Sequence, residues 1–165
     1  MKKFIVINGT MGVGKTTISK ELLKSLNNAV WLDGDWCWMM NPWVVNEESI
    51  RMVENNITYM LRNFIINSNF EYVIFSWVLH REEILNGLLE RMSDLEFELV
   101  KVSLICSEEV LRQRMEMDHR TQEQITLSIN RLRLYENMDT AKIDTTEATI
   151  KALIDRIKGI INNNK

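Results

Sequence analysis

The sequence predicts a single α/β domain built on a parallel β-sheet. Short apolar runs typical of buried strands alternate with segments whose hydrophobic residues recur at helical spacing. A glycine-rich motif stands between the first apolar run and the first helical segment, as in a strand–loop–helix unit. The length of 165 residues suits one domain with helices on both faces of its sheet.

Five strand-like segments follow one another along the chain. The first is residues 3–8, which includes the apolar run from Phe4 to Ile7, and the others are predicted at 29–33, 71–76, 97–105 and 140–143. Strands that alternate with helices favour parallel pairing through right-handed crossovers.

Helical periodicity appears after each strand. The segment after the glycine motif carries apolar residues at 18, 22, 23 and 26, and longer amphipathic helices are predicted over 47–68, 81–92 and 147–161. Two helix starts are marked, because Asn46 precedes two glutamates and Thr121 forms a capping box with Gln124. The longest irregular stretch is 34–46, and long loops in compact domains are often functional.

Residues 9–16 read Gly-Thr-Met-Gly-Val-Gly-Lys-Thr, a complete G-x-x-x-x-G-K-[ST] phosphate-binding loop. Its glycines permit turns that let successive N–H groups converge on phosphate oxygens, and the following helix adds its positive end. Lys15 supplies a charge for the β- and γ-phosphates, and the Thr16 hydroxyl is the expected Mg²⁺ ligand. A glycine-rich turn without a ligand is the alternative, which the register of strand, loop, Lys15 and Thr16 disfavours. We therefore predict a nucleoside triphosphate site formed by Gly9, Thr10, Met11, Gly12, Val13, Gly14, Lys15, Thr16 and Thr17.

Composition and charge exclude several classes of protein. The net charge is −3 and no run of basic residues appears, so nothing indicates a nucleic-acid groove. Cys37 and Cys106 fit neither a zinc spacing nor a redox motif, which favours free thiols in a reducing compartment. The N-terminal apolar stretch is too short for a signal peptide and runs into the phosphate loop, and no stretch approaches a membrane span. We expect a soluble cytoplasmic protein, either a monomer or a homodimer.

Four segments in order carry a family resemblance. They are the loop GTMGVGKT, LDGD at 32–35 after the second strand, SEEVLRQRMEMDHR at 107–120 after the fourth, and NRLRLY at 130–135. Together they resemble the small P-loop kinases of the nucleoside-monophosphate kinase fold, a group with shikimate, gluconate and adenylylsulfate kinases and chloramphenicol phosphotransferase. The resemblance implies a three-layer fold with a five-stranded parallel sheet in the order 2-3-1-4-5. It also implies one kinase domain over 1–165, with an acceptor-binding part at about 34–68 and a lid at about 115–122.

The activity that the resemblance implies is transfer of the γ-phosphate of ATP, with Mg²⁺, to a hydroxyl or phosphate of a small molecule. Asp33 and Asp35 end the second strand, where ligands of parallel sheets bind. By resemblance, Asp35 orients or deprotonates the acceptor hydroxyl and Asp33 supports the metal, although the two roles could be reversed. An ordinary Asx-type turn is the structural alternative.

Arginines match the charge of a phosphoryl group in flight and often lie on a mobile lid. The resemblance places the lid around 117–121 and assigns catalytic roles to Lys15, Arg114, Arg120 and Arg131 beside Asp35. The alternative for each arginine is a solvated helix face.

Four of the five tryptophans fall between positions 31 and 43. If residues 36–43 form an acceptor lid, Trp36, Trp38 and Trp43 should be partly exposed, and the acceptor should have an apolar or planar part. A packed cap over the sheet edge is the alternative. His80 follows the third strand and is expected either to cap the next helix or to contact the substrate.

Two other functions stay open. A nucleoside-monophosphate kinase would need cations for the acceptor phosphate, for which Arg51, Arg62 and Arg81 are the candidates. A regulatory nucleotide-binding protein or slow ATPase is the second, although the third strand ends at Ser76 without the metal-supporting aspartate common in motor ATPases and GTPases.

Overall fold

The computed structural model describes residues 1–163, whose strands form one parallel sheet. The strands lie in the order β2-β3-β1-β4-β5, which confirms the predicted order. Their bounds are Lys3–Asn8 for β1, Ala29–Asp33 for β2, Tyr72–Trp77 for β3, Glu98–Ile105 for β4 and Ala141–Asp144 for β5. Each predicted strand is present, with ends shifted by at most one residue.

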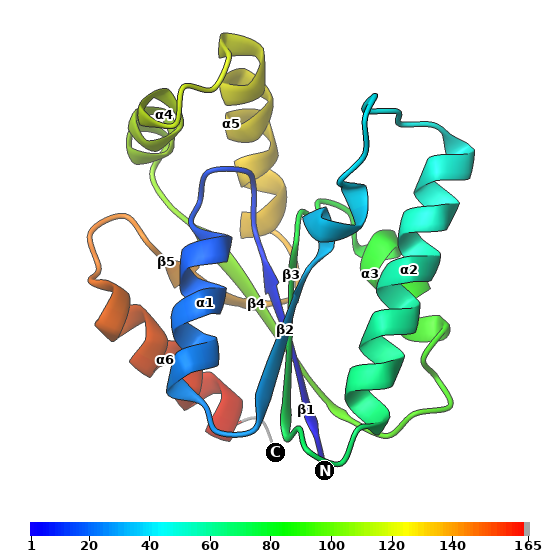
Figure 1. The fold of residues 1–165 in the computed structure, drawn as a ribbon. Coiled ribbons are helices and arrows are strands. Elements are labelled where there is room, and N and C mark those ends of the chain that lie inside the picture. The colour runs from blue at the N-terminus through cyan, green and yellow to red at the C-terminus, as the bar shows by residue number, and fades with distance from the viewer. Residues whose placement is uncertain (164–165) are drawn as a thin grey trace.

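Helices cover both faces of this sheet (Figure 1). Helices α1 (Lys15–Ser25) and α6 (Ile150–Asn163) lie on one side, and α2 (Glu47–Ile66) and α3 (Glu82–Glu90) lie on the other. Helices α4 (Glu108–Met117) and α5 (Gln122–Glu136) stand beyond the carboxyl end of β4, joined by a short turn. The three layers predicted from the resemblance are therefore confirmed.

Two hydrophobic cores, one on each face of the sheet, explain the apolar strand pattern. Along β1, Ile5 and Ile7 belong to the core under α1 and α6, whereas Phe4 and Val6 belong to the core under α2 and α3. All four side chains are buried, because a central parallel strand is covered on both faces. Hence β1 appears in the sequence as a continuous hydrophobic run.

Helix starts follow the predicted capping signals in two cases and not in a third. The Asn46 carboxamide accepts a hydrogen bond from the backbone N–H of Ser49, and Thr121 forms a complete capping box with Gln124. The prediction that His80 caps the next helix is wrong: Arg81 occupies the cap position of α3, and its side chain makes no capping bond. The backbone already turns into the helix one residue after His80.

The stretch predicted as irregular at 34–46 begins with a short helix. Residues Gly34–Trp38 form the 3₁₀ helix η1, whose first turn is capped by the Asp33 carboxylate through the N–H of Asp35. A single 3₁₀ turn has too few residues to show periodicity in the sequence. The remaining residues up to Asn46 contain no regular element.

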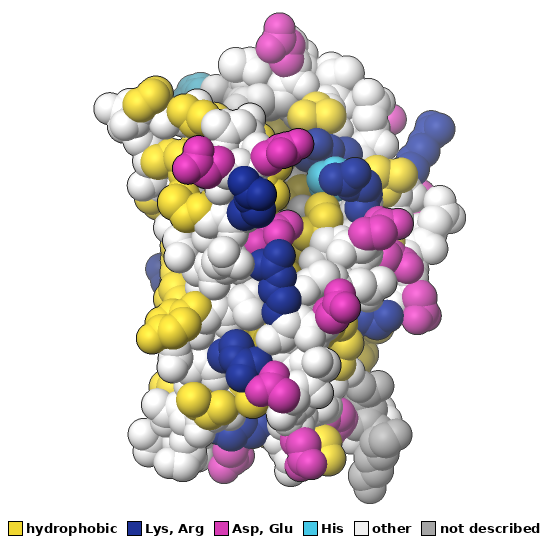
Figure 2. Space-filling model, turned by 90° about the vertical axis from the view of Figure 1, so that its right-hand side faces the viewer, with side chains coloured by type: hydrophobic (Ala, Val, Ile, Leu, Met, Phe, Trp, Pro, Cys, Tyr) yellow, Lys and Arg dark blue, Asp and Glu magenta, His cyan; other side chains and the backbone are white. Residues whose placement is uncertain are grey.

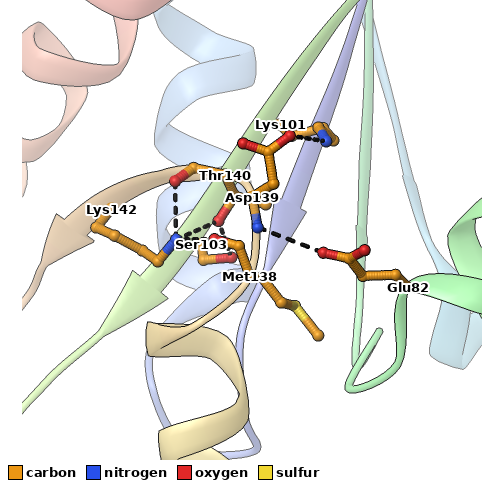
Figure 3. A network of polar contacts seen from close by, with 7 residues as sticks. All are labelled: Glu82, Lys101, Ser103, Met138, Asp139, Thr140 and Lys142. Atoms are coloured by element: carbon orange, nitrogen blue, oxygen red, sulfur yellow. Dashed lines mark hydrogen bonds and ion pairs between the residues drawn. The ribbon is translucent and has the colours of Figure 1, made fainter.

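Polar contacts fix the connection between α5 and β5 to the rest of the sheet (Figure 3). Asp139 receives the Lys101 ammonium at 3.2 Å, and its backbone N–H donates to Glu82 on α3. Thr140 donates to the Ser103 hydroxyl at 2.7 Å, and Lys142 donates to the carbonyls of Met138 and Thr140. These contacts attach the edge strand β5 to β4 and α3.

The surface of the described chain mixes charges with scattered apolar side chains. Figure 2 looks onto the side that carries α2 and α3, and shows hydrophobic side chains gathered mainly in its upper part and along one edge. Exposed apolar residues of the segment after η1 and of α2 include Met39, Trp43, Val45, Met52, Tyr59 and Ile66. Within residues 1–163, no helix has the length and apolar character needed to cross a membrane.

Candidate active site

A cleft of about 920 Å³ opens at the carboxyl end of the sheet. Its floor is the phosphate loop and the start of α1. One wall comes from the segment after β5 and from α6, with Thr145, Ala148, Ile150 and Leu153. The opposite wall comes from the end of β2, from η1 and the segment after it, and from the residue that follows β3, with Asp33, Asp35, Met39, Trp43 and Val78. The end of α4 and the turn that joins it to α5 line the cleft with Met117, Asp118 and Arg120.

Two loop glycines are required by close packing as well as by backbone conformation. Gly12 has a φ of +82°, and a Cβ atom there would lie 2.6 Å from Cγ of Met115. Gly9 has a φ of +151°, and a Cβ atom there would lie 2.9 Å from the carbonyl oxygen of Leu104. Side chains at either position would force the loop away from β4 and α4.

The Lys15 ammonium lies inside the loop. Nζ donates to the carbonyl oxygens of Gly9 and Thr10, both at 2.9 Å. Burial lowers the pKa of Lys15 to about 8, and the nearby charges of Asp35 and Asp33 only partly oppose this shift. Both hydrogen-bond partners of this half-buried ammonium are neutral, so an anion in the loop would stabilise its charged form.

Asp33 has two contacts that correspond to the two interpretations of the LDGD segment. Its Oδ1 accepts from the N–H of Asp35 at 3.0 Å, as an Asx-type turn would, and its Oδ2 lies 3.4 Å from the Thr16 hydroxyl. Burial raises the pKa of Asp33, and the neighbouring Asp35 charge adds to the effect, while the Asp35 N–H and Lys15 oppose it. One carboxylate therefore both caps η1 and faces the proposed metal ligand.

Gly34 separates these aspartates for a reason the sequence does not reveal. A Cβ atom at Gly34 would lie 2.4 Å from Cγ of Trp77, so the indole ring packs directly on the glycine. The Trp77 ring thus supports the turn that carries Asp33 and Asp35.

The predicted arginines occupy three different environments. Arg114 donates to the Thr145 hydroxyl at 3.0 Å and to the Thr145 carbonyl at 2.6 Å, and its Nη1 lies 3.4 Å from the Val13 carbonyl. Arg120 is exposed and lines the cleft. Arg131 does not line the cleft; it is half-buried on α5, where its charge adds to the burial that lowers the pKa of His80.

The tryptophans divide into exposed and buried rings. Trp43 and Trp36 are 62% and 51% exposed, whereas Trp38 is only 8% exposed and belongs to the core under α2. The prediction of partial exposure is therefore wrong for Trp38, because η1 turns this ring inward against α2 and α3. Trp43 and Met39 line the cleft, and the Trp43 ring lies 5.3 Å from that of Trp38.

Two groups of site residues were not predicted from the sequence. Thr145, Ala148, Ile150 and Leu153 form the wall beside Arg114. Ser128 on α5 fastens the phosphate loop, because its hydroxyl donates to the Met11 carbonyl at 2.8 Å and its carbonyl accepts from Thr10. Neither group belongs to a short motif, and only the three-dimensional fold brings them to the loop.

Substitution of Trp38 and of Trp43 distinguishes a ring packed in the core from a ring that lines the cleft. Trp38→Ala is expected to cost about 3 to 5 kcal/mol of unfolding free energy, because it empties a core site. Trp43→Ala is expected to change stability by less than about 1 kcal/mol, since most of its ring is already exposed. Urea unfolding followed by far-ultraviolet circular dichroism measures both. Equal losses for the two variants would contradict the assignment of Trp43 to the cleft wall.

Comparisons with known proteins agree with this geometry. Residues 5–144 match a protein family described as an AAA domain. A gluconokinase from Sinorhizobium meliloti 1021 superposes with a TM-score of 0.70 at 16% identity, covering 98% of this chain and 91% of the other. The shikimate kinase from Acinetobacter baumannii gives 0.69 at 20% identity (100% and 96% covered), and the tunicamycin resistance protein of Deinococcus radiodurans gives 0.68 at 19% (96% and 95%). No protein of curated function matches the sequence.

These structures share the fold over nearly the full length of both chains, which confirms the predicted resemblance to small P-loop kinases. The family match covers the sheet from β1 to β5 together with the phosphate loop. The chain thus belongs to the AAA domain family, and its fold is that of the small P-loop kinases of the shikimate and gluconate kinase type.

Proposed function

We propose that this protein is an ATP-dependent phosphotransferase that moves the γ-phosphate of ATP to a hydroxyl of a small molecule. The observation that carries the proposal is the placement of Asp33 and Asp35 on the wall of the same cleft whose floor is the phosphate loop. A nucleotide in the loop would present its terminal phosphate to this wall. An acceptor bound there would lie between the phosphate and a carboxylate able to take its proton.

The opposite wall suits a nucleobase. Ala148, Ile150 and Leu153 offer apolar surface, and the Arg114 guanidinium is held beside them by its two bonds to Thr145. A planar guanidinium stacks well on an aromatic base. We therefore assign this wall to the adenine of ATP and the loop, residues 9–17, to its phosphates.

The residues at the loop fit a magnesium ion. Thr16 Oγ1 and Asp33 Oδ2 are hard oxygen donors 3.4 Å apart, and Mg²⁺ in nucleotide sites takes few protein ligands besides phosphate and water. Residues 1–163 contain no group of three or more His, Cys, Asp or Glu side chains arranged for a metal, so a site made by protein ligands alone is not indicated there. When bound with ATP, Mg²⁺ would neutralise charge on the β- and γ-phosphates.

The chain's own groups have separable tasks in this proposal. Asp35 would orient the acceptor hydroxyl and accept its proton, and Lys15 would neutralise the transferring phosphoryl group. Arg120 lies in the turn between α4 and α5, which we propose as the lid (115–122) that closes over ATP and excludes water. Arg131 lies away from the cleft lining, so a direct role would require lid closure to bring α5 inward.

The acceptor wall disfavours an anionic acceptor and suits a molecule with an apolar or planar part. Met39 and Trp43 line it with largely exposed apolar surface, and its charged groups are two carboxylates. The cations that a nucleotide acceptor would need lie elsewhere: Arg62 forms a two-pronged pair with Asp94, and neither Arg51 nor Arg81 lines the cleft. This arrangement disfavours a nucleoside-monophosphate kinase.

Acceptor panels test this assignment. We expect uncharged hydroxyl compounds with an aromatic part to be phosphorylated, as detected by mass spectrometry of the product. Nucleoside monophosphates and simple sugar acids serve as the comparison sets. Phosphorylation confined to the monophosphates would contradict the proposed acceptor class and assign the protein to the nucleoside-monophosphate kinases.

Both cysteines are free, which suits the cytoplasmic location that we propose.

The pH dependence of nucleotide binding follows from Lys15. Its pKa of about 8 in the free protein means that about half of the Lys15 side chains have lost the proton at pH 8, whereas bound phosphates favour the charged form. Binding of Mg-ATP should therefore take up protons near pH 8.5, and affinity should fall as pH rises beyond 8. Calorimetric titration in two buffers of different ionisation enthalpy measures the uptake, with Lys15→Arg as the control that removes it. Proton release would contradict this assignment.

A further inference from the structure

The last residue of β1, Asn8, is a polar side chain in a buried position. It follows the apolar run Phe4–Ile7, is only 4% exposed and directly precedes the first glycine of the phosphate loop. A buried carboxamide is costly unless its donor and acceptor are both satisfied. Its partners therefore indicate what the residue does.

Asn8 binds the backbone of two separate segments. Its Oδ1 accepts from the N–H of Gly9 and from the N–H of Leu79, both at 2.9 Å. Its Nδ2 donates to the Leu79 carbonyl at 3.0 Å and lies 3.4 Å from Sδ of Met138. The carboxamide thus bonds to both the N–H and the carbonyl of Leu79, as the backbone of a neighbouring strand would. The last residue pair of β1 and β3 is Asn8 with Trp77, and Leu79 lies two residues after Trp77.

The two segments that Asn8 joins belong to different parts of the cleft, namely the phosphate loop and the acceptor wall. The Gly9 carbonyl holds the Lys15 ammonium, so the Asn8–Gly9 bond belongs to the phosphate loop. The segment around Leu79 belongs to the acceptor wall, because Val78 lines the cleft and the Trp77 ring packs on Gly34 between the two aspartates. The Asn8 carboxamide is thus bonded to both of these parts.

We infer that Asn8 is a positioning residue that fixes the acceptor wall at residues 77–80 relative to the phosphate loop. The inference rests on the proposed function, since it takes nucleotide to occupy the loop and acceptor to meet residues 77–80. A displacement of the loop backbone on phosphate binding would then be transmitted through Gly9 and the carboxamide to Leu79. Asn8 itself touches neither ligand in this scheme.

Substitutions at position 8 remove different numbers of these hydrogen bonds. An ionised aspartate has nearly the same shape and accepts from both N–H groups, but it cannot donate to the Leu79 carbonyl. Alanine removes all of the side-chain bonds. The coupling between the two segments should therefore decrease in the order asparagine, aspartate, alanine.

Hydrogen exchange followed by mass spectrometry tests the inference with Mg-ATP as the probe. In the wild-type chain, saturating Mg-ATP should slow exchange in residues 9–17 and also in residues 76–82. In Asn8→Ala the effect on 9–17 should persist at saturation and the effect on 76–82 should be lost, with Mg-ATP affinity reduced roughly tenfold, as expected for one or two lost hydrogen bonds. Asn8→Asp should retain part of the response at 76–82, and this variant carries the test if Asn8→Ala does not fold.

The matched control is Val100→Ala, which removes core packing in β4 at a residue paired with Ile5 rather than with Asn8. It should lower stability and leave both nucleotide responses as in the wild type. A response at 76–82 that survives in Asn8→Ala, or that is absent in the wild type while 9–17 responds, would overturn the inference. If neither segment of the wild type responds to Mg-ATP, the proposed function itself fails, and the coupling fails with it.

Discussion

Replacement of Lys15 by alanine is expected to abolish phosphotransfer from ATP while the protein remains folded. The ammonium lies inside the phosphate loop, where it would meet the β- and γ-phosphates. Loss of a single preorganised charge of this kind costs at least about 10²- to 10³-fold in rate. The fold should tolerate the change, because burial already disfavours the charged form of Lys15, as its lowered pKa of about 8 shows.

Calorimetric Mg-ATP titration and acceptor-dependent product formation measure the effect of Lys15→Ala. The matched control is Lys20→Ala, which removes an exposed lysine from the same helix and should change neither quantity. Full phosphotransfer by Lys15→Ala at saturating ATP would contradict the assignment of the phosphate loop to the phosphates of ATP.

Replacement of Asp35 by asparagine is expected to reduce turnover by roughly 10²- to 10⁴-fold, which is the contribution of a positioned general base. Mg-ATP affinity should stay nearly unchanged, because Asp35 serves the acceptor side of the cleft. Steady-state kinetics with an acceptor from the panel, combined with calorimetric binding, separates the two effects.

Asp33→Asn is the matched comparison for Asp35→Asn. Its Oδ1 can still cap the Asp35 N–H, so η1 should form, but the negative charge facing Thr16 is lost. We expect a higher Mg²⁺ requirement with a smaller effect on turnover at saturating Mg²⁺. The reverse pattern, with Mg-ATP binding lost in Asp35→Asn and turnover lost in Asp33→Asn, would exchange the two roles.

Much of the fold could be predicted because its signals are local. Apolar runs define strands that are buried on both faces, and the capping residues Asn46 and Thr121 satisfy the first N–H groups of their own helices. The phosphate loop is equally local, since all of its groups lie within nine consecutive residues. The strand order followed only from the family resemblance, because a pattern of alternating elements does not specify which strands are neighbours.

The parts of the site that escaped prediction depend on contacts between distant segments. Trp38 and Trp43 both lie in the stretch 34–46, and the sequence does not distinguish them. Trp38 is buried because it ends η1, whereas Trp43 lies beyond η1 and lines the cleft. Arg114 is bound by Thr145, which is 31 positions away, and this pairing orients its guanidinium in a way that no helix periodicity indicates. Asn8 looks like part of a strand in the sequence, and its function as a link appears only when Leu79 is placed beside it.

The most direct test of the central claim measures ADP release from Mg-ATP in the presence and absence of candidate acceptors, while inorganic phosphate is quantified in the same reaction. The proposal predicts that an uncharged hydroxyl compound with an aromatic part accelerates ADP release, that phosphorylated product matches the ADP formed, and that Lys15→Ala shows neither. ADP release that is equal with and without every acceptor, and is matched by inorganic phosphate, would contradict the claim and identify a slow ATPase instead.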